Sequence, residues 1–158
     1  MNIHEYYMRK AIQQANVALK ENEVPTGCII VSQGTDAPNN NGRIIARAHN
    51  QVELLKDPTA HAEMIAITQA ASAIGDWRLT DTILYVTKEP CPMCAGAIVL
   101  ARIPTVVFGV SDPKAGGAVS TFNILNHAQL NHHCKIISGI LEDECRLILQ
   151  NFFKAKRS

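Results

Sequence analysis

The stretch "TKEPCPMCAGAIV", residues 87–99, sets two cysteines three positions apart and then continues into small and apolar residues. Its prolines favour the first turn of a helix, because proline lacks the N–H that this turn leaves unpaired and already has a helical φ. The run "TILYVT", residues 82–87, has the length and the apolar content of a buried strand. The sequence therefore predicts a strand followed by a helix whose start carries Cys91 and Cys94.

The alternation of strands and helices continues on both sides of this stretch. Apolar residues at helical spacing predict helices, and short apolar runs between turn signals predict strands. We expect helices over about residues 2–21 and 60–74, from the prolines at 90 and 92, and from about 142, with strands at 26–33, 42–50, 82–87, 105–110 and near 134–138. The turn-rich residues 34–41 join the first two strands, and Asn41-Gly42 is a hairpin signal.

This order of elements favours a three-layer α/β/α sandwich around a mixed five-stranded sheet. A chain of 158 residues is one domain's worth, so we expect a single domain over 1–158. The N-terminus carries charge where a signal peptide is apolar, and the apolar run Ala95–Ala101 is far shorter than the roughly 18 residues of a membrane span. We therefore expect a cytoplasmic protein with no membrane partner.

The five cysteines are an odd number in a chain without an export signal, which favours thiols or metal ligands over a disulfide framework. Cys28, Cys134 and Cys145 have no partner at metal-ligand spacing, and we interpret them as small core residues. Cys91 and Cys94 alone would fit a redox pair or a structural zinc clip as well as a catalytic site.

The segment "DPTAHAEMIAI", thirty residues upstream, supplies the missing partners at the start of another helix. His61 with Cys91 and Cys94 makes a three-ligand zinc set, which leaves the fourth tetrahedral position free for water, as in catalytic sites. Glu63 can then take a proton from that water and return it to the substrate. The combination predicts hydrolytic attack on an electron-poor carbon.

His-x-Glu followed by Pro-Cys-x-x-Cys is the signature of the zinc nucleobase deaminases. The rest of the chain resembles the bacterial tRNA-specific adenosine deaminases of the cytidine deaminase superfamily, from the first helix to the final Phe-Phe. The resemblance rests on "DPTAHAE", "LYVT", "EPC", "MCAGAI", "RIP", "VVFG", the spaced Asp112 and Lys114, "GIL" and "DEC".

The resemblance implies a cytidine deaminase-like fold and conversion of adenosine to inosine at the wobble position of a tRNA anticodon loop, by a homodimer with one Zn²⁺ per subunit. It makes His61, Cys91 and Cys94 the ligands and Glu63 the proton shuttle. It also assigns substrate contacts to Asn50, to the backbone at Ala62 and Pro90, and to Asp112, Lys114 and Phe153.

Several substrate assignments have alternatives in the sequence. The amide of Asn50 carries a donor and an acceptor and so suits adenine, but a strand-end asparagine also bonds its own turn. Phe152 and Phe153 continue the helical spacing of the last helix, so at least one should be core. The chain departs from the family pattern at positions that bear on RNA binding and not on zinc: Lys88, Pro92, Ser111, Val119 and His133.

Two other functions remain open from the sequence. A free nucleobase deaminase, acting on guanine or cytosine, would share the zinc centre, and "PCPMC" is a form associated with such enzymes. A tRNA-binding subunit with structural zinc would hold the metal without turnover, although Glu63 argues against that role. The size of the substrate separates the first of these from a tRNA enzyme.

Overall fold

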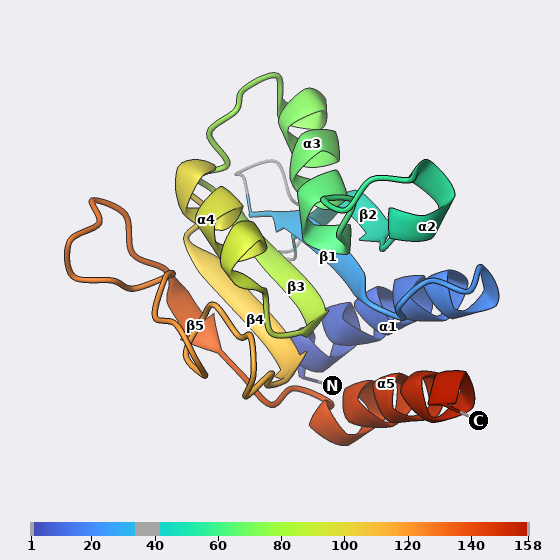
Figure 1. Cartoon of the computed structure of the whole chain (residues 1–158). Coiled ribbons are helices and arrows are strands. Elements are labelled where there is room, and N and C mark those ends of the chain that lie inside the picture. Colours follow the sequence, from blue (N-terminus) through green and yellow to red (C-terminus); the bar gives the residue numbers. More distant parts are fainter. Residues whose placement is uncertain (1, 34–41, 158) are drawn as a thin grey trace.

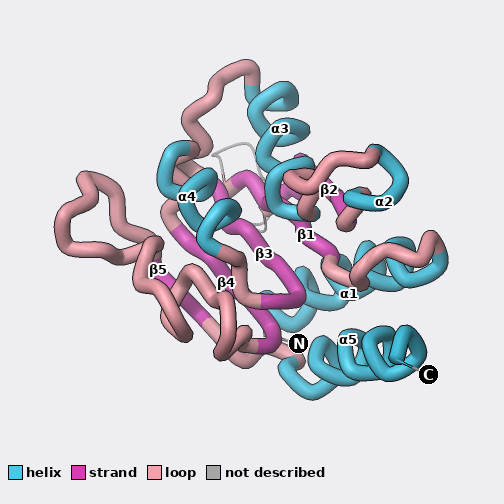
Figure 2. The backbone as a smooth tube through the Cα atoms, in the orientation of Figure 1, coloured by secondary structure: helices cyan, strands magenta, loops and turns pink. Residues whose placement is uncertain are grey.

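The computed structural model describes residues 2–33 and 42–157, and the predicted hairpin link at 34–41 lies outside them. Within the described residues, five strands form one sheet in the order β2-β1-β3-β4-β5 (Figures 1 and 2). β1 pairs antiparallel with β2 and β3, whereas β3, β4 and β5 run parallel, so the sheet is mixed, as predicted. The strands are β1 Gly27–Ser32, β2 Arg43–His49, β3 Thr82–Lys88, β4 Thr105–Val110 and β5 Lys135–Ile137.

Helices cover both faces of this sheet and complete the predicted three-layer sandwich. α1 (Ile3–Lys20) and α5 (Glu142–Arg157) pack on one face, and α3 (Ala62–Ile74) and α4 (Pro92–Leu100) pack on the other (Figure 1). One turn of helix, α2 (Val52–Leu55), follows β2 and was not predicted. No described helix has the length and apolarity needed to cross a bilayer.

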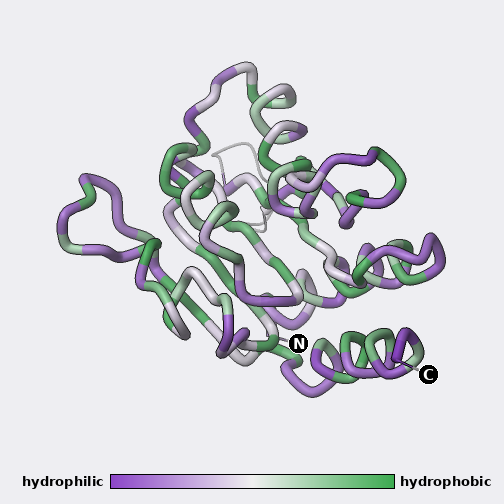
Figure 3. The backbone as a smooth tube through the Cα atoms, in the orientation of Figure 1, coloured by the Kyte–Doolittle hydropathy of each residue, from purple (hydrophilic) through white to green (hydrophobic). Residues whose placement is uncertain are grey.

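The three central strands, β1, β3 and β4, bury both of their faces because helices lie on both sides of the sheet. In β3, Tyr85 packs with the α1 and α5 side, and its neighbour Leu84 packs with the α3 and α4 side. Figure 3 shows hydrophobic residues along the strands and hydrophilic ones along the loop that precedes β5. This two-sided burial explains why these three strands appear in the sequence as continuous apolar runs rather than as alternating ones. Cys28, Cys134 and Cys145 are buried, as expected.

The topology gathers several helix and strand ends at one end of the sheet. β3 leads directly into α4, and α3 begins shortly after β2 and α2 on the same face (Figure 1). The carboxyl ends of the parallel strands β3 and β4 lie side by side there. The loop after β4 starts at this end, so the N-termini of α3 and α4 and the loop after β4 surround one place.

Candidate metal and catalytic site

Three sulfur and nitrogen atoms meet where α3 and α4 begin. His61 is the N-cap of α3, Cys91 is the N-cap of α4, and Cys94 lies in the first turn of α4. Nδ1 of His61 is 3.6 Å from Sγ of Cys91 and 3.5 Å from Sγ of Cys94. All three ligand atoms lie within 4.8 Å of one another, so the structure brings together the residues that the sequence predicted as metal ligands.

The spacing of these atoms fits a tetrahedral metal ion. Zinc bonds of about 2.3 Å to sulfur and about 2.1 Å to nitrogen, at a tetrahedral angle, put sulfur and nitrogen about 3.6 Å apart. The two observed separations, 3.6 and 3.5 Å, agree with that value. One imidazole and two thiols are also the donors that suit zinc. The geometry and the chemistry of the group therefore both fit a bound metal ion.

The two thiols differ in acidity because they share a hydrogen bond. The Cys94 thiol donates to the Cys91 sulfur and lowers the pKa of Cys91 to about 4, with His61 contributing in the same direction. The same hydrogen bond, together with burial, raises the pKa of Cys94. Cys91 is therefore the more acidic of the two thiols and lies at the positive end of the α4 dipole, whereas metal binding requires both as thiolates.

Glu63 lies in the first turn of α3, two residues after His61, and is only 4 % exposed. Burial raises the pKa of its carboxyl group above the ordinary value, which suits a group that must both accept and donate a proton. Glu63 is not one of the three grouped residues. It lines a cavity of about 190 Å³ that His61 and Cys91 also line. The cavity is lined by Val24, Thr26, Asn50, His61, Glu63, Lys88, Glu89, Cys91 and Phe153.

Asn50 follows β2 and lies in the cavity wall with its side-chain carbonyl already engaged. Oδ1 accepts a hydrogen bond of 2.7 Å from the backbone N–H of Ala62, in the first turn of α3. The carbonyl of Pro90 likewise accepts from the N–H of Gly117, at 2.6 Å. The N–H of Ala62 and the carbonyl of Pro90, which the sequence predicted to contact the base, therefore make hydrogen bonds within the protein. The side chain of Asn50 keeps its amide nitrogen as a donor.

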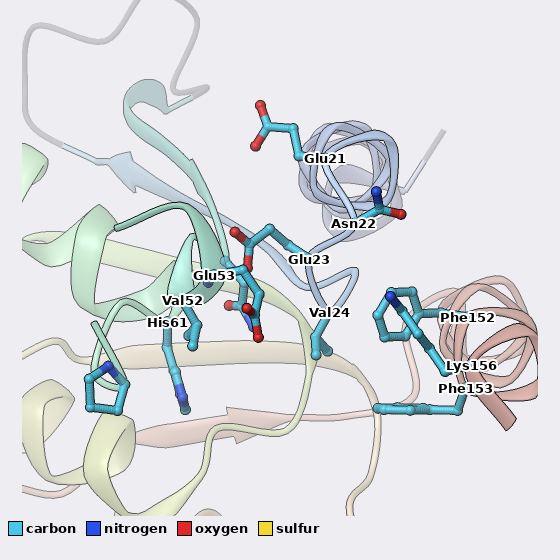
Figure 4. Close-up of a pocket in the computed structure, with 12 residues that line it drawn as sticks. Glu21, Asn22, Glu23, Val24, Val52, Glu53, His61, Phe152, Phe153 and Lys156 are labelled. Atoms are coloured by element: carbon cyan, nitrogen blue, oxygen red, sulfur yellow. Dashed lines mark hydrogen bonds between the residues drawn. The ribbon is translucent and has the colours of Figure 1, made fainter. Parts of the chain in front are cut away.

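A larger groove of about 760 Å³ adjoins the cavity and shares several of its residues. In Figure 4, Phe153 and Lys156 extend from α5 on the side of the groove opposite His61. Phe153 is 43 % exposed and lines both spaces, whereas Phe152 is buried. The prediction that at least one of this pair belongs to the core is confirmed, and Phe153 is the one that is free to contact a ligand.

Asp112 and Lys114 lie in the loop after β4 and line neither the cavity nor the groove. Oδ1 of Asp112 accepts hydrogen bonds from the N–H groups of Lys114 and Ala115, at 3.1 and 3.2 Å. Oδ2 lies 3.2 Å from Nζ of Lys88. Burial opposes ionisation of Asp112, but Lys88 and the N–H donors hold its pKa below the usual range. The side chain of Lys114 is exposed.

Two buried carboxylates next to the site were missed by the sequence analysis. Glu89 accepts hydrogen bonds from the backbone N–H groups of the loop after β4, at residues 112 and 118–120, and from the Ser120 hydroxyl. Glu23 accepts from the N–H groups of Glu53 and Leu54 and so caps α2. The only sequence signal for Glu89 was its place directly before Pro90-Cys91. Its hydrogen-bond partners lie more than twenty residues further along the chain.

Comparison with known proteins places this site in a family. The model of the MafB19-like deaminases matches residues 2–157. A tRNA-specific adenosine deaminase of Bacillus subtilis is 46 % identical over 157 residues, which cover 99 % of this chain and 92 % of the relative. One from Aquifex aeolicus is 47 % identical over 154 residues, covering 98 % and 96 %.

Solved structures agree with the sequence relatives. A structure from a study of A-to-I editing by tRNA deaminases at the wobble position is 39 % identical, with a TM-score of 0.83, over 91 % of this chain and 99 % of that one. A guanine deaminase from Bacillus subtilis is also 39 % identical, but with a TM-score of 0.61 over 70 % and 66 % of the two chains. The fold, the full-length identity and the ligand geometry agree: the chain belongs to the family of tRNA-specific adenosine deaminases.

Proposed function

We propose that this protein is a zinc-dependent enzyme that hydrolyses adenosine to inosine at the wobble position of a tRNA anticodon loop. One observation carries the proposal: a chain 46 % identical to a tRNA-specific adenosine deaminase over nearly its whole length has a His61, Cys91 and Cys94 group at zinc spacing. A tRNA substrate points to the cytoplasm as its compartment. The family model spans residues 2–157, which supports a single catalytic domain over 1–158.

The reaction adds the oxygen of water to the ring carbon that bears the amino group and releases ammonia. His61, Cys91 and Cys94 would hold the zinc ion, which would supply the acidification of water that the hydrolysis needs. Glu63 accepts the proton that the attacking water loses and delivers a proton to the departing nitrogen, because its carboxyl group lines the cavity and has a raised pKa. Its burial keeps competing solvent protons away from these transfers.

The remaining predicted residues hold the nucleotide in this proposal. Asn50 donates through its amide nitrogen to the base, while its carbonyl holds the start of α3. Phe153 lines the passage between the cavity and the groove and can stack on a neighbouring base. Ala62 and Pro90 shape the edge of the cavity through their backbone. Asp112 and Lys114 contact the strand from the loop after β4.

A homodimer with one Zn²⁺ per subunit is the assembly that we propose. An apolar groove of about 500 Å³ lies over the outer sides of α3 and α4, where Leu100 is 70 % exposed. An exposed apolar surface of this kind is typical of an interaction site, and a second copy of the chain offers the same surface in return. The groove is lined by Met64, Pro92, Met93, Gly96, Ala97, Val99, Leu100, Ile124 and Leu130.

A free guanine or cytosine deaminase is the second candidate, supported by the partial similarity to a Bacillus subtilis guanine deaminase. The groove argues for the larger substrate, because its space of about 760 Å³ continues outward from a catalytic cavity of about 190 Å³. A free base would occupy the cavity alone and leave the groove unused.

Inosine formation by the zinc-loaded protein tests the proposal directly. The substrates are an anticodon stem-loop RNA with a wobble adenosine and, in parallel, free adenosine, guanine and cytosine. Inosine in the RNA, without ammonia release from the free compounds, is the expected result. Ammonia from guanine or cytosine with an unchanged RNA would instead assign the free-base activity. Bound zinc without any turnover would mean a binding subunit.

A further inference from the structure

We propose that Lys88 binds a backbone phosphate of the RNA next to the target adenosine, a role that rests on the function proposed above. Lys88 is the last residue of β3 and lines the catalytic cavity together with His61 and Glu63. Apart from His61, it is the one basic side chain among the described residues that line this cavity. An RNA strand that inserts one base there must bring its phosphates to the rim.

The ammonium of Lys88 is held in place by Asp112. Nζ lies 3.2 Å from Oδ2 of Asp112, and the two side chains are 33 % and 17 % exposed. This half-buried pair keeps the lysine from swinging freely into solvent, as most surface lysines do. A lysine ammonium has three donors, so contact with one carboxylate oxygen leaves donors for a second anion.

Asp112 in turn is held by its own loop and not by the lysine. Its Oδ1 accepts the N–H groups of Lys114 and Ala115, and its own N–H donates 3.0 Å to Oε1 of Glu89. The carboxylate would therefore keep its place without Lys88. The loop therefore does not need the ion pair to fix Asp112. The pair instead positions the ammonium of Lys88 at the rim of the cavity, where it can bind an anion.

Hydrogen-bond donors compensate the negative charge of Glu89 and Asp112, the two carboxylates next to Lys88 in the chain or in space, so a phosphate can approach. The Glu89 carboxylate is buried and accepts five hydrogen bonds from the loop. The charge of Asp112 faces Lys88 itself and two N–H donors. The N-termini of α3 and α4 add positive partial charge at this end of the sheet.

The test measures RNA binding with single phosphates neutralised. Three stem-loops are compared, one with normal linkages and two with a methylphosphonate on the 5′ or the 3′ side of the target adenosine. Dissociation constants are measured by fluorescence anisotropy over a series of salt concentrations, in zinc-loaded proteins that carry Glu63→Ala to prevent turnover. The variants are Lys88→Met, Lys88→Arg and, as a matched loss of one charge, Arg78→Met. Arg78 forms a 3.2 Å pair with Asp76 and lines neither cavity nor groove.

We expect Lys88→Met to weaken binding of the normal stem-loop about 3- to 5-fold and to reduce the slope of log K against log salt by about 0.7. One of the two methylphosphonate RNAs should bind the protein that retains Lys88 as weakly as the normal stem-loop binds Lys88→Met. On that RNA, Lys88→Met should cause no further loss of affinity. Lys88→Arg should keep most of the affinity, which also shows that the position tolerates substitution. Arg78→Met should change neither quantity.

Equal losses by Lys88→Met on all three RNAs would overturn the phosphate contact, because they would indicate a general field effect. An unchanged affinity would overturn it as well. The parent protein, with Glu63 intact, is assayed for inosine on the normal stem-loop in parallel. Inosine without any Lys88 effect refutes the inference alone, whereas absence of inosine refutes the proposed function.

Discussion

Glu63 is nearly completely buried and lies in the first turn of α3, two residues after the proposed metal ligand His61. Its carboxyl group is expensive to bury in a charged form, which is why its pKa is raised. A purely structural metal site has no need of such a group. A substitution of Glu63 can therefore test catalysis separately from metal binding.

Replacement Glu63→Gln should abolish deamination and leave the metal bound. The amide keeps the size of the side chain but cannot carry the proton, so we expect kcat to fall by a factor of about 10² to 10⁴. Inosine formation and the zinc-to-protein ratio measure the two effects separately. Glu144→Gln, on the exposed surface of α5, serves as the control. A Glu63→Gln enzyme with parental kcat would refute the proton-shuttle role.

Glu89 is the residue on which the loop after β4 depends. Replacement Glu89→Gln turns an acceptor-only carboxylate into an amide whose NH₂ faces backbone N–H donors of residues 118–120. We expect the free energy of unfolding to fall by about 1–3 kcal/mol. Urea unfolding measures the loss, with Glu142→Gln as the exposed control. No loss of stability would mean that the loop holds itself.

The loss caused by Glu89→Gln should depend on pH. Burial opposes ionisation of Glu89, but the hydrogen bonds from Ser120 and the loop N–H groups lower its pKa below the ordinary 4.5. Below that pH the unfolded chain binds more protons than the folded one, so the carboxylate stabilises fully above about pH 4.5 and progressively less as pH falls. Parent and variant should therefore converge in stability in acid, and a constant difference would contradict this.

At the scale of elements, the sequence predicted those that local patterns define. The strands at 82–87 and 105–110 are apolar on both faces and nearly coincide with β3 and β4. The grouping of His61, Cys91 and Cys94 could be predicted because the starts of two helices fix the positions of these residues. α2 was missed because Glu23, thirty residues away, accepts its first N–H groups. Glu89 and the Lys88–Asp112 pair were missed for the same reason, since their partners come from another part of the chain.

The close approach of α1 to β1 depends on Gly27. A Cβ at this position would overlap the carbonyl oxygen of Ala11 and lie 2.5 Å from the backbone nitrogen of Ala15. Neither atom can move without shifting the helix, so Gly27→Ala should lower the free energy of unfolding by about 1–3 kcal/mol or more. Thermal and urea unfolding measure the change. Parental stability would show that α1 can slide along the sheet without cost.

The proposed metal ligands connect the starts of α3 and α4, so metal binding and folding should be coupled. A chelator should lower the unfolding midpoint, and free zinc at a hundred times its Kd should stabilise by about 2.7 kcal/mol. Cys91→Ser should remove most of this zinc dependence. Cys134→Ser is the matched control, because that thiol is buried elsewhere and donates to the Ile103 carbonyl. Equal zinc dependence in both variants would remove Cys91 from the ligand set.

At the scale of the whole molecule, the two helical layers are not equivalent. α1 and α5 carry acidic residues in their first turns and basic residues in their last turns, whereas α3 and α4 border an apolar groove close to the His61, Cys91 and Cys94 group. Pro92 and Met93 line this groove, and Cys91 and Cys94 on the same helix belong to the metal group. Association through this face would therefore bring a second subunit close to the catalytic centre.

Leu100→Glu should convert the proposed dimer to a monomer. Leu100 is 70 % exposed in the apolar groove, and a carboxylate there would be buried against the apolar surface of a second copy. Leu54→Glu is the matched control, because Leu54 is 64 % exposed but lies on α2 and not in that groove. Sedimentation equilibrium should show a dimer for the parent and for Leu54→Glu, and a monomer for Leu100→Glu. A parent that sediments as a monomer would refute the proposed dimer, and a Leu100→Glu protein that remains dimeric would place the interface elsewhere.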